Sequence, residues 1–139
     1  MASEFFLDTS YAIALSVESD EHHQLAEGLA ERLETNQTPI VTTRAVLLEI
    51  GNALSKKRYR EAAGELLDAL EQDPQVEIVP LTEELYQQAL ALFSSRQDKE
   101  WGMVDCVSFV VMQERGLTNA LTTDEHFEQA GFRLLLRRK

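Results

Sequence analysis

Phe5-Phe6-Leu7-Asp8-Thr9-Ser10 is a short apolar run that stops at polar residues of the kind that cap helices. Three consecutive apolar residues favour a buried strand, and the polar residues after them favour the start of a helix. A strand that leads directly into a helix is the repeating unit of parallel α/β folds. The segment therefore predicts a strand followed at once by a helix.

The same alternation continues along the chain. The other short apolar runs are 40–41, 76–79, 120–121 and 132–136. One helical pattern covers residues 20–34. A second begins at Thr42-Thr43, and helical spacing continues up to Asp73-Pro74. Further helices are expected to begin at Thr82 and to span 103–116. Strands separated by helices pair in parallel through right-handed crossovers. We predict one α/β domain over 1–139, with a parallel sheet of about four to five strands flanked by helices.

Composition predicts a globular protein without disulfides. The chain has 139 residues, of which 44% are hydrophobic and 27% charged. Its one cysteine, Cys106, lies in an apolar stretch and has no partner for an internal disulfide, so we expect a buried thiol and a cytoplasmic setting. We expect no membrane span or secretion signal, because the sequence lacks an apolar run of about 18 residues.

The balance of charges argues against a polyanionic partner. Thirteen basic and 24 acidic residues give a formal net charge of −11. Bulk charge of this sign repels nucleic acid. A metal ion held by several carboxylates would reverse the local field regardless of the total. The local arrangement of the acids is therefore the deciding question.

Two aspartates follow predicted strands. Asp8 follows the strand at 5–7, and Asp124 follows the apolar run at 120–121. Ligand sites of open parallel sheets lie beyond the carboxyl ends of the strands, so both carboxylates are expected at one edge. Each aspartate alone is explained as well by helix capping. Capping does not explain why further acids lie inside helices.

Two more acids lie within predicted helices. Asp105 belongs to a helix that is apolar nearly all round, where an unpaired carboxylate is costly to bury. The alternative is an acid of the first turn satisfied by the helix N-terminus. Glu49 lies in mid-helix with Asn52 one turn later, and its alternative is a solvated surface glutamate.

A group of carboxylates favours Mg²⁺ or Mn²⁺. Zinc is disfavoured because its usual cysteine and histidine ligands show no paired spacing in this sequence. The cysteine and the three histidines are interpreted instead as core, surface or helix-start residues: Cys106, His22, His23 and His126.

Four motifs in order carry a family resemblance. They are Phe-Leu-Asp-Thr-Ser, a helical Glu followed by Asn-Ala-Leu, Val-Asp in an apolar helix, and Leu-Thr-Thr-Asp-Glu-His-Phe. Over nearly the whole chain this pattern resembles the PIN-domain ribonucleases, especially small stand-alone members such as VapC-type toxins. The resemblance implies a three-layer α/β/α fold and a catalytic, metal-binding site formed by Asp8, Glu49, Asp105 and Asp124. Asp8 and Asp105 are the implied direct metal ligands.

The implied reaction is hydrolysis of RNA phosphodiester bonds, in which the cation polarises phosphate oxygens and promotes in-line attack by water. Auxiliary residues implied by position are Asp98, Thr9, Ser10, Asn52, Thr122 and Thr123, of which the hydroxyl residues are equally plausible as helix caps. Gly102 stands where the family often has serine. The resemblance also implies a homodimer and an antitoxin partner whose tail fills the acidic groove.

Basic residues suggest where an RNA backbone would lie. They are Arg44, Lys56, Lys57, Arg58 and Arg60, with Arg96 and Lys99 further along. An ordinary solvated helix face is the alternative. Trp101 and Tyr59 are suited to base stacking or, equally, to packing.

Two other functions compete with the nuclease. A metal-dependent phosphatase or phosphotransfer domain would use Asp8 as nucleophile, but the expected second aspartate nearby is missing from Asp8-Thr9-Ser10-Tyr11. A PIN-like module that binds RNA or protein and cleaves poorly is the other alternative. Retention of all four acids argues against it.

Overall fold

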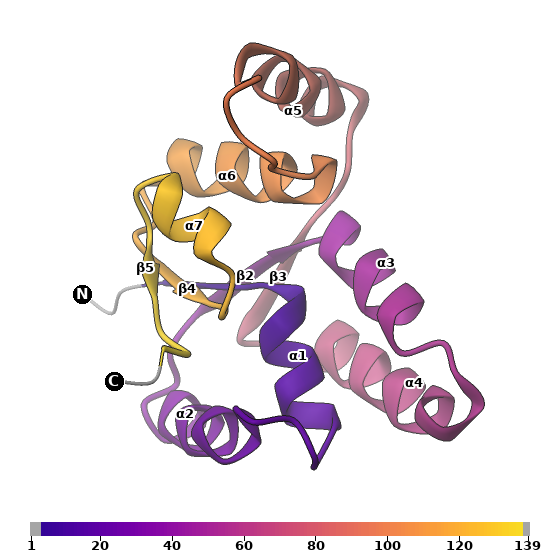
Figure 1. Cartoon of the computed structure of the whole chain (residues 1–139). Helices are drawn as coiled ribbons and strands as arrows, with labels where there is room; N and C mark the ends of the chain where they lie inside the picture. The colour runs from indigo at the N-terminus through magenta and orange to yellow at the C-terminus, as the bar shows by residue number, and fades with distance from the viewer. Residues whose placement is uncertain (1–3, 138–139) are drawn as a thin grey trace.

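The computed structural model describes residues 4–137 and places five strands and seven helices within them (Figure 1). The strands are β1 (Phe5–Leu7), β2 (Ile40–Thr43), β3 (Val76–Val79), β4 (Asn119–Leu121) and β5 (Arg133–Leu134). The helices are α1 (Thr9–Ser16), α2 (His23–Thr35), α3 (Arg44–Ala53), α4 (Lys57–Gln72), α5 (Glu83–Ser95), α6 (Met103–Arg115) and α7 (Glu125–Gln129).

The strands form one parallel sheet, as predicted. Their order is β3-β2-β1-β4-β5, so β1 occupies the centre. Phe5 is in register with Ile40 of β2 on one side and with Asn119 of β4 on the other. The chain order reverses between β1 and β4, which is the place where open α/β sheets bind ligands beyond the strand ends. Asp8 and Asp124 follow these two strands.

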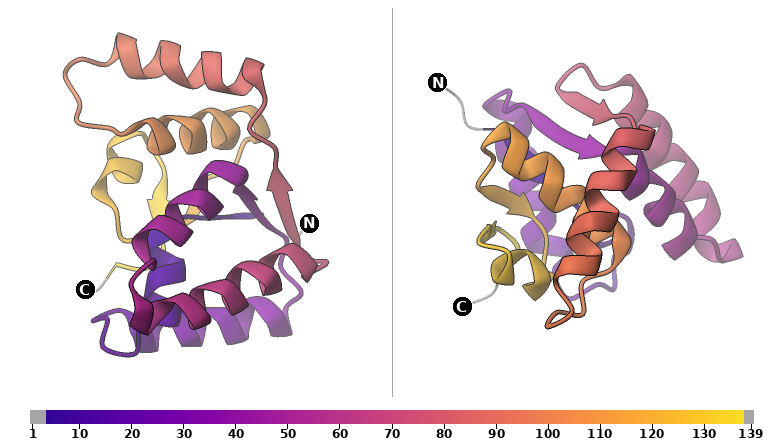
Figure 2. Two further views of the ribbon diagram at one scale, coloured as in Figure 1. Left: turned by 90° about the vertical axis from the view of Figure 1, so that its right-hand side faces the viewer. Right: turned by 90° about the horizontal axis from the view of Figure 1, so that it is seen from above.

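Helices cover both faces of the sheet, which confirms the predicted α/β/α arrangement. In Figures 1 and 2, α1, α2 and α4 lie on one side of the sheet, while α6 and α7 lie on the other. Helix α5 packs on α6, outside the sheet layer. Helix α3 follows β2 directly and contacts α1, α4 and α6, so it joins the two layers. None of the helices within residues 4–137 is long and apolar enough to cross a membrane.

An aromatic cluster fills the core beneath α6 and α7. The rings of Trp101 and Phe109, and of Phe109 and Phe127, meet edge to face with centroids 4.9 Å apart. Trp101 is only 6% exposed, and its indole N–H donates to Gln129 at 3.0 Å. This residue is therefore a core residue, as the packing alternative proposed, and it anchors α7 against the start of α6.

Several element boundaries differ from the sequence prediction. Helix α2 begins at His23, three residues late, because the Asp20 carboxylate accepts from the His22 N–H and holds a turn there. Thr42 and Thr43 belong to β2, and the Thr43 hydroxyl then caps α3. The run at 132–136 pairs only over two residues. The predicted end of α6 at Gly116, which adopts φ 66°, is confirmed.

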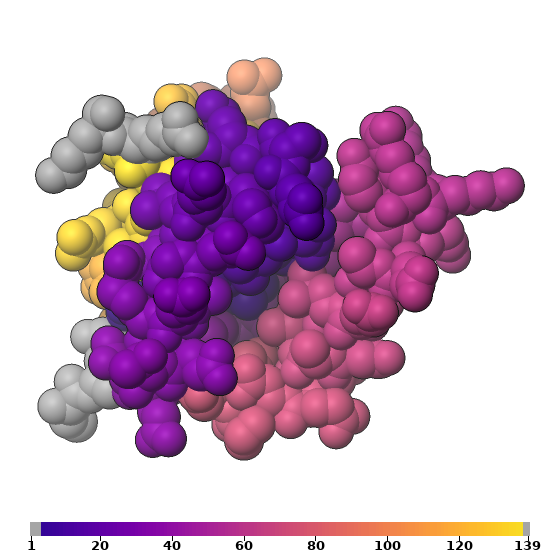
Figure 3. All heavy atoms as spheres, turned by 90° about the horizontal axis from the view of Figure 1, so that it is seen from below, coloured from indigo at the N-terminus to yellow at the C-terminus, as the bar shows by residue number. Residues whose placement is uncertain are grey.

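A groove of about 450 Å³ opens between α1, α2 and α4. Seen from below in Figure 3, the surface is hollowed between α2 and α4. Apolar side chains predominate in its lining, among them Leu7, Tyr11, Leu15, Leu33, Leu66 and Leu70.

Candidate functional site

The four acids expected from the sequence each stand at a defined place in the fold. Asp8 and Asp124 occupy the cap positions of α1 and α7, immediately after β1 and β4. Asp105 lies in the first turn of α6, and Glu49 lies in the middle of α3. We call these four residues the acidic site.

Asp8 is a buried carboxylate without a cation. It is 5% exposed, and among residues 4–137 no lysine, arginine or histidine forms an ion pair with it. The Thr122 hydroxyl donates to its Oδ2 atom at 2.8 Å. Burial raises the pKa of Asp8 to about 7; the Thr122 hydroxyl opposes this rise, and the charges on Glu49 and Asp105 add to it. A bound cation would therefore offset the free-energy cost of ionising the buried Asp8 carboxyl.

A hydroxyl network ties the ends of β1 and β4 together. Thr122 is fully buried, and the proton of its hydroxyl goes to Asp8. Its oxygen accepts from the Asp124 N–H at 3.0 Å and lies 3.0 Å from Ser10 Oγ, which must therefore be the donor of that pair. Ser10 in turn accepts from the Thr123 N–H at 2.9 Å. These contacts fix the separation of the two strand ends.

Glu49 is held against α1. The Thr9 hydroxyl donates to the Glu49 carboxylate, and Thr9 itself is buried. Glu49 is half-buried rather than fully solvated, whereas Asn52, one turn later, is exposed. Glu49 also lies close enough to Asp8 for its charge to raise the pKa of that carboxyl.

Asp105 combines capping with a second contact. Its Oδ2 atom accepts from the Gly102 N–H at 3.1 Å, so the helix N-terminus does satisfy this acid. The same oxygen lies 2.9 Å from Nδ1 of His126. Nδ1 also lies 3.5 Å from Oδ1 of Asp124, the oxygen that accepts from the His126 N–H and caps α7. The structure therefore joins Asp105 to Asp124 through a histidine.

His126 is the member of this group that sequence reasoning missed. Partial burial lowers its pKa, but the hydrogen bond to Asp105 and the charges on Asp105 and Asp124 outweigh that effect and leave the pKa raised. The prediction that His126 lies at a helix start is confirmed, since the residue lies in the first turn of α7. Its contact with Asp105 comes from the packing of α7 on α6, which no spacing in the sequence reveals.

Asp98 lies apart from the acidic site. It is exposed in the turn before α6, where both of its oxygens accept from Arg96 at 3.0 Å and Lys99 stands nearby. The Arg96 guanidinium lowers the pKa of Asp98 to about 2. Within the described residues, no contact links Asp98 to the four acids.

Most of the candidate basic residues lie away from the end of β2, but Arg44 follows β2 directly as the first residue of α3. Arg44 is exposed and pairs with Glu71 at 2.8 Å. Lys56, Lys57, Arg58 and Arg60 stand around the turn between α3 and α4, which Figure 1 places at the far end of α3 from the sheet. Arg58 lies over the ring of the half-buried Tyr59.

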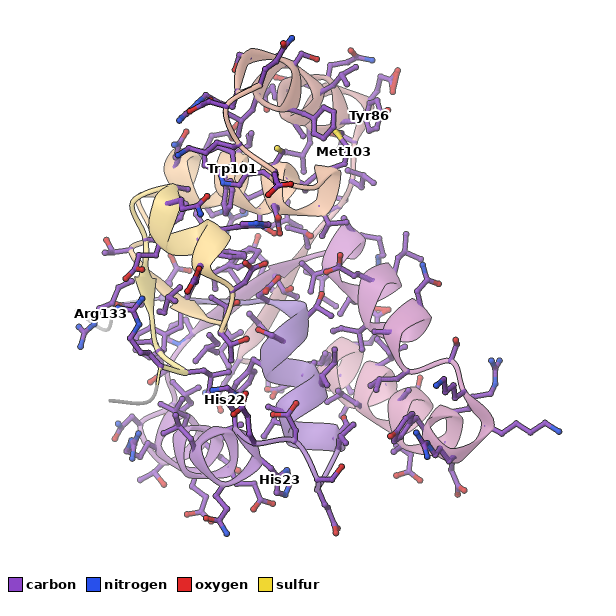
Figure 4. All side chains as sticks on the ribbon, in the orientation of Figure 1. His22, His23, Tyr86, Trp101, Met103 and Arg133 are labelled. Atoms are coloured by element: carbon purple, nitrogen blue, oxygen red, sulfur yellow. The ribbon has the colours of Figure 1, made fainter. Side chains whose placement is uncertain are left out.

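The residues of the acidic site fit a divalent cation. Asp105, Asp124 and His126 each offer a ligand atom, and these atoms lie within 4.8 Å of one another. Asp8 adds a buried carboxylate that has no cation of its own among residues 4–137. In Figure 4 His22 and His23 lie at the turn between α1 and α2, away from α6 and α7. Carboxylate oxygens are the preferred ligands of Mg²⁺ and Mn²⁺.

Comparisons with known proteins place the chain in a family. Residues 5–133 match the PIN domain. The 23S rRNA-specific endonuclease VapC20 of Mycobacterium tuberculosis is 32% identical over 127 residues, which cover 91% of this chain and 94% of the relative. The crystal structure of Mycobacterium tuberculosis VapC20, described as a sarcin-ricin loop cleaving toxin, matches with a TM-score of 0.80 and 30% identity, covering 93% of this chain and 96% of that one.

More distant solved structures share the fold. VapBC2 from Rickettsia felis, bound to a DNA fragment from its promoter, matches with a TM-score of 0.68 at 17% identity and covers 94% of this chain and 96% of that chain. The match over 5–133, together with the 32% identity across nearly the whole length, shows that this chain belongs to the PIN domain family.

Proposed function

We propose that this protein is a single-domain, metal-dependent endoribonuclease of the VapC type and that the acidic site is its catalytic site. The relationship to an rRNA endonuclease supports the reaction class. The observation that carries the assignment of the site is Asp8, a carboxylate buried without a cation beside two further acids. A protein gains nothing in stability from such a group unless a ligand compensates it.

The four acids divide between two proposed tasks. A bound Mg²⁺ or Mn²⁺ supplies Lewis-acid stabilisation of the phosphate and lowers the cost of attack by water. Asp8 and Asp105 hold the ion. Glu49 and Asp124 position the attacking water or a second ion. Thr9 and Thr122 are positioning residues, because each donates its hydroxyl proton to one of these carboxylates and fixes its orientation.

The substrate we propose is structured ribosomal RNA. VapC20 is described as specific for 23S rRNA and as cleaving the sarcin-ricin loop. Lys56, Lys57, Arg58 and Arg60 form a basic region beyond the acidic site, which supports contact with the backbone of a large RNA at some distance from the cut. The net charge of −11 makes this local region the main source of attraction.

The deciding experiment is cleavage of intact ribosomes, purified 23S rRNA and a mixed pool of short RNAs. Wild type is compared with Asp8→Asn and Asp105→Asn, each with Mg²⁺, Mn²⁺ or chelator. We expect a discrete rRNA fragment that requires a divalent ion and disappears in both variants. Wild type that folds, binds RNA equally with and without metal, and never cuts it would establish a binding module instead.

An antitoxin is the proposed protein partner. Structural relatives include VapBC assemblies and FitAcB from Neisseria gonorrhoeae. The groove between α1, α2 and α4 offers apolar surface for a partner segment, and the acidic site offers carboxylates that a basic side chain would pair with. Co-expression with the adjacent gene product is expected to give a copurifying complex that inhibits cleavage. Independent purification of the two proteins would contradict this proposal.

A homodimer is proposed through the outer face of α5. Tyr86 and Phe93 are separated by seven residues, so they share one face of the helix, and they are 42% and 44% exposed. Exposed aromatic side chains aligned in this way favour association. Sedimentation of wild type is expected to show dimers, and Tyr86→Lys with Phe93→Lys is expected to yield monomers. A monomeric wild type at micromolar concentration would remove the homodimer.

A further inference from the structure

We propose that His126 is a metal ligand of the acidic site and that its nitrogen gives the site a preference for Mn²⁺ over Mg²⁺. This inference rests on the proposed function, because it assigns a residue to the ion that the nuclease requires. An imidazole ligand would make the site different from one formed by carboxylates alone, and it would change which divalent ion binds more tightly.

Geometry is the first support. Nδ1 of His126 lies 2.9 Å from Oδ2 of Asp105 and 3.5 Å from Oδ1 of Asp124. One candidate ligand atom from each of the three residues fits within a span of 4.8 Å. Donors on opposite sides of an ion with bonds of about 2.1 Å are separated by about 4 Å. Only small side-chain movements would therefore bring Nδ1 of His126 to the ion that Asp105 holds, with Asp124 beside it.

The rigidity of α7 is the second support. His126 is followed by Phe127, which is fully buried and packs edge to face on Phe109. Gln129, one turn later, accepts from the buried Trp101 indole. These contacts anchor α7 at its middle and at its last residue, so the imidazole is carried by a helix that is packed against the core. Ligands on preorganised elements lose less entropy when they bind an ion.

The chemistry of the donor set predicts the ion. Both ions suit carboxylate oxygens, but Mg²⁺ demands near-ideal octahedral oxygen coordination and keeps several waters, whereas Mn²⁺, as a first-row transition metal, tolerates an added imidazole nitrogen better. Of the three histidines in the chain, His22 contacts Asp20 and His23 contacts the carbonyl of Ala14, both at the turn between α1 and α2. A nitrogen signal from the bound ion can therefore be assigned to His126 by substitution.

Electron spin echo spectroscopy of the full-length protein with one equivalent of Mn²⁺ tests the proposal directly. Wild type is expected to show ¹⁴N modulation from a coordinated imidazole. His126→Gln is expected to lose that modulation, and the matched control His22→Gln is expected to retain it. Calorimetric titration with Mn²⁺ and Mg²⁺ adds affinity: His126→Gln is expected to weaken Mn²⁺ binding on the order of tenfold and Mg²⁺ binding less.

The outcomes separate this inference from the proposed function. Tight Mn²⁺ binding by wild type without ¹⁴N modulation would overturn the role of His126 and leave the carboxylate site intact. Equal losses of Mn²⁺ and Mg²⁺ affinity in His126→Gln, with unchanged modulation, would reduce His126 to a residue that positions Asp105. Failure of wild type to bind either ion would overturn both proposals.

Discussion

The acidic site and the exposed turn that carries Asp98 both gather negative charge, but they compensate it in opposite ways. In the turn, Asp98 accepts two hydrogen bonds from Arg96, and its pKa falls to about 2. In the site, Asp8 is buried beside other acids, and its pKa rises to about 7. The difference lies in the source of the cation. The chain supplies its own cation to Asp98, whereas Asp8 has no cationic partner among residues 4–137 and in the proposed function meets an ion from solution.

Activity should show the largest contrast between the two regions. Asp105→Asn removes a carboxylate of the proposed site and is expected to reduce the cleavage rate on the order of 10³-fold, as loss of a key electrostatic stabiliser does. Asp98→Asn is the matched control, and the rate should be unchanged because among residues 4–137 its carboxylate pairs with Arg96 and Lys99 and with none of the four acids. Single-turnover cleavage of one RNA measures both rates. Similar losses of cleavage rate in Asp105→Asn and Asp98→Asn would contradict the proposed difference between the acidic site and the turn.

Without metal, Asp8→Asn is expected to raise the free energy of unfolding, although the same substitution is expected to abolish cleavage. The folded-state pKa of Asp8 is above its ordinary value of 3.8, so ionisation of Asp8 costs folding free energy as pH rises from 3.8 to about 7. At about 1.4 kcal/mol per pH unit, the full cost is up to about 4 kcal/mol above pH 7. Asp8→Asn is therefore expected to be more stable than wild type at pH 8 in chelator.

Urea unfolding at pH 5 and pH 8 measures this effect. The advantage of Asp8→Asn should be small at pH 5 and larger at pH 8, and added Mn²⁺ should stabilise wild type more than the variant. A pH-independent difference between the two proteins would show that packing, rather than charge, separates them.

The hydroxyl network should have an intermediate effect. Thr122→Val removes the donor to Asp8 and the acceptor of the Asp124 N–H, so it leaves buried polar groups unpaired. A loss of about 1–3 kcal/mol in the free energy of unfolding is expected. Thr118→Val, at an exposed position, is the control and should change stability little. Chemical denaturation with matched m-values measures both.

The smallest effect is expected at Gly102. A side chain fits here, since a Cβ atom would lie 4.0 Å from Oδ2 of Asp105 and the backbone conformation is extended. Gly102→Ser should stabilise the start of α6 by a few tenths of a kcal/mol, roughly the difference between glycine and serine at an N-cap. A thermal melt measures the gain. A lower melting temperature would show that serine disturbs Asp105.

The fold and the positions of Asp8, Asp124 and Asp105 were predictable because they follow local rules, whereas Glu49 was selected only by the family resemblance. Short apolar runs that end in capping residues mark strand ends, and carboxylates placed after parallel strands meet at one edge. Asp8 and Asp124 obey this rule, and Asp105 could be located because its helix is apolar on most sides. The exact boundaries of β2 and β5 were not predictable, since pairing with neighbouring strands sets them.

The finer contacts were not predictable because they depend on tertiary packing. His126 meets Asp105 across the contact between α6 and α7, and Thr122 meets Asp8 across 114 positions of the chain. Asp98 was predicted as an auxiliary residue, and its pairing with Arg96 depends on a local turn that the sequence does not reveal. Sequence gives the residue types at a site, while packing selects which of them touch.

The central place of β1 has a consequence for biosynthesis. Its partner β4 lies more than a hundred residues later, and the groups around the site run from Asp8 to His126. Contacts so distant in sequence form late, after most of the chain has been made. A nascent chain that has not yet reached β4 and α7 therefore lacks the complete acidic site. Topology therefore delays assembly of the proposed site until β4 and α7 have been synthesised.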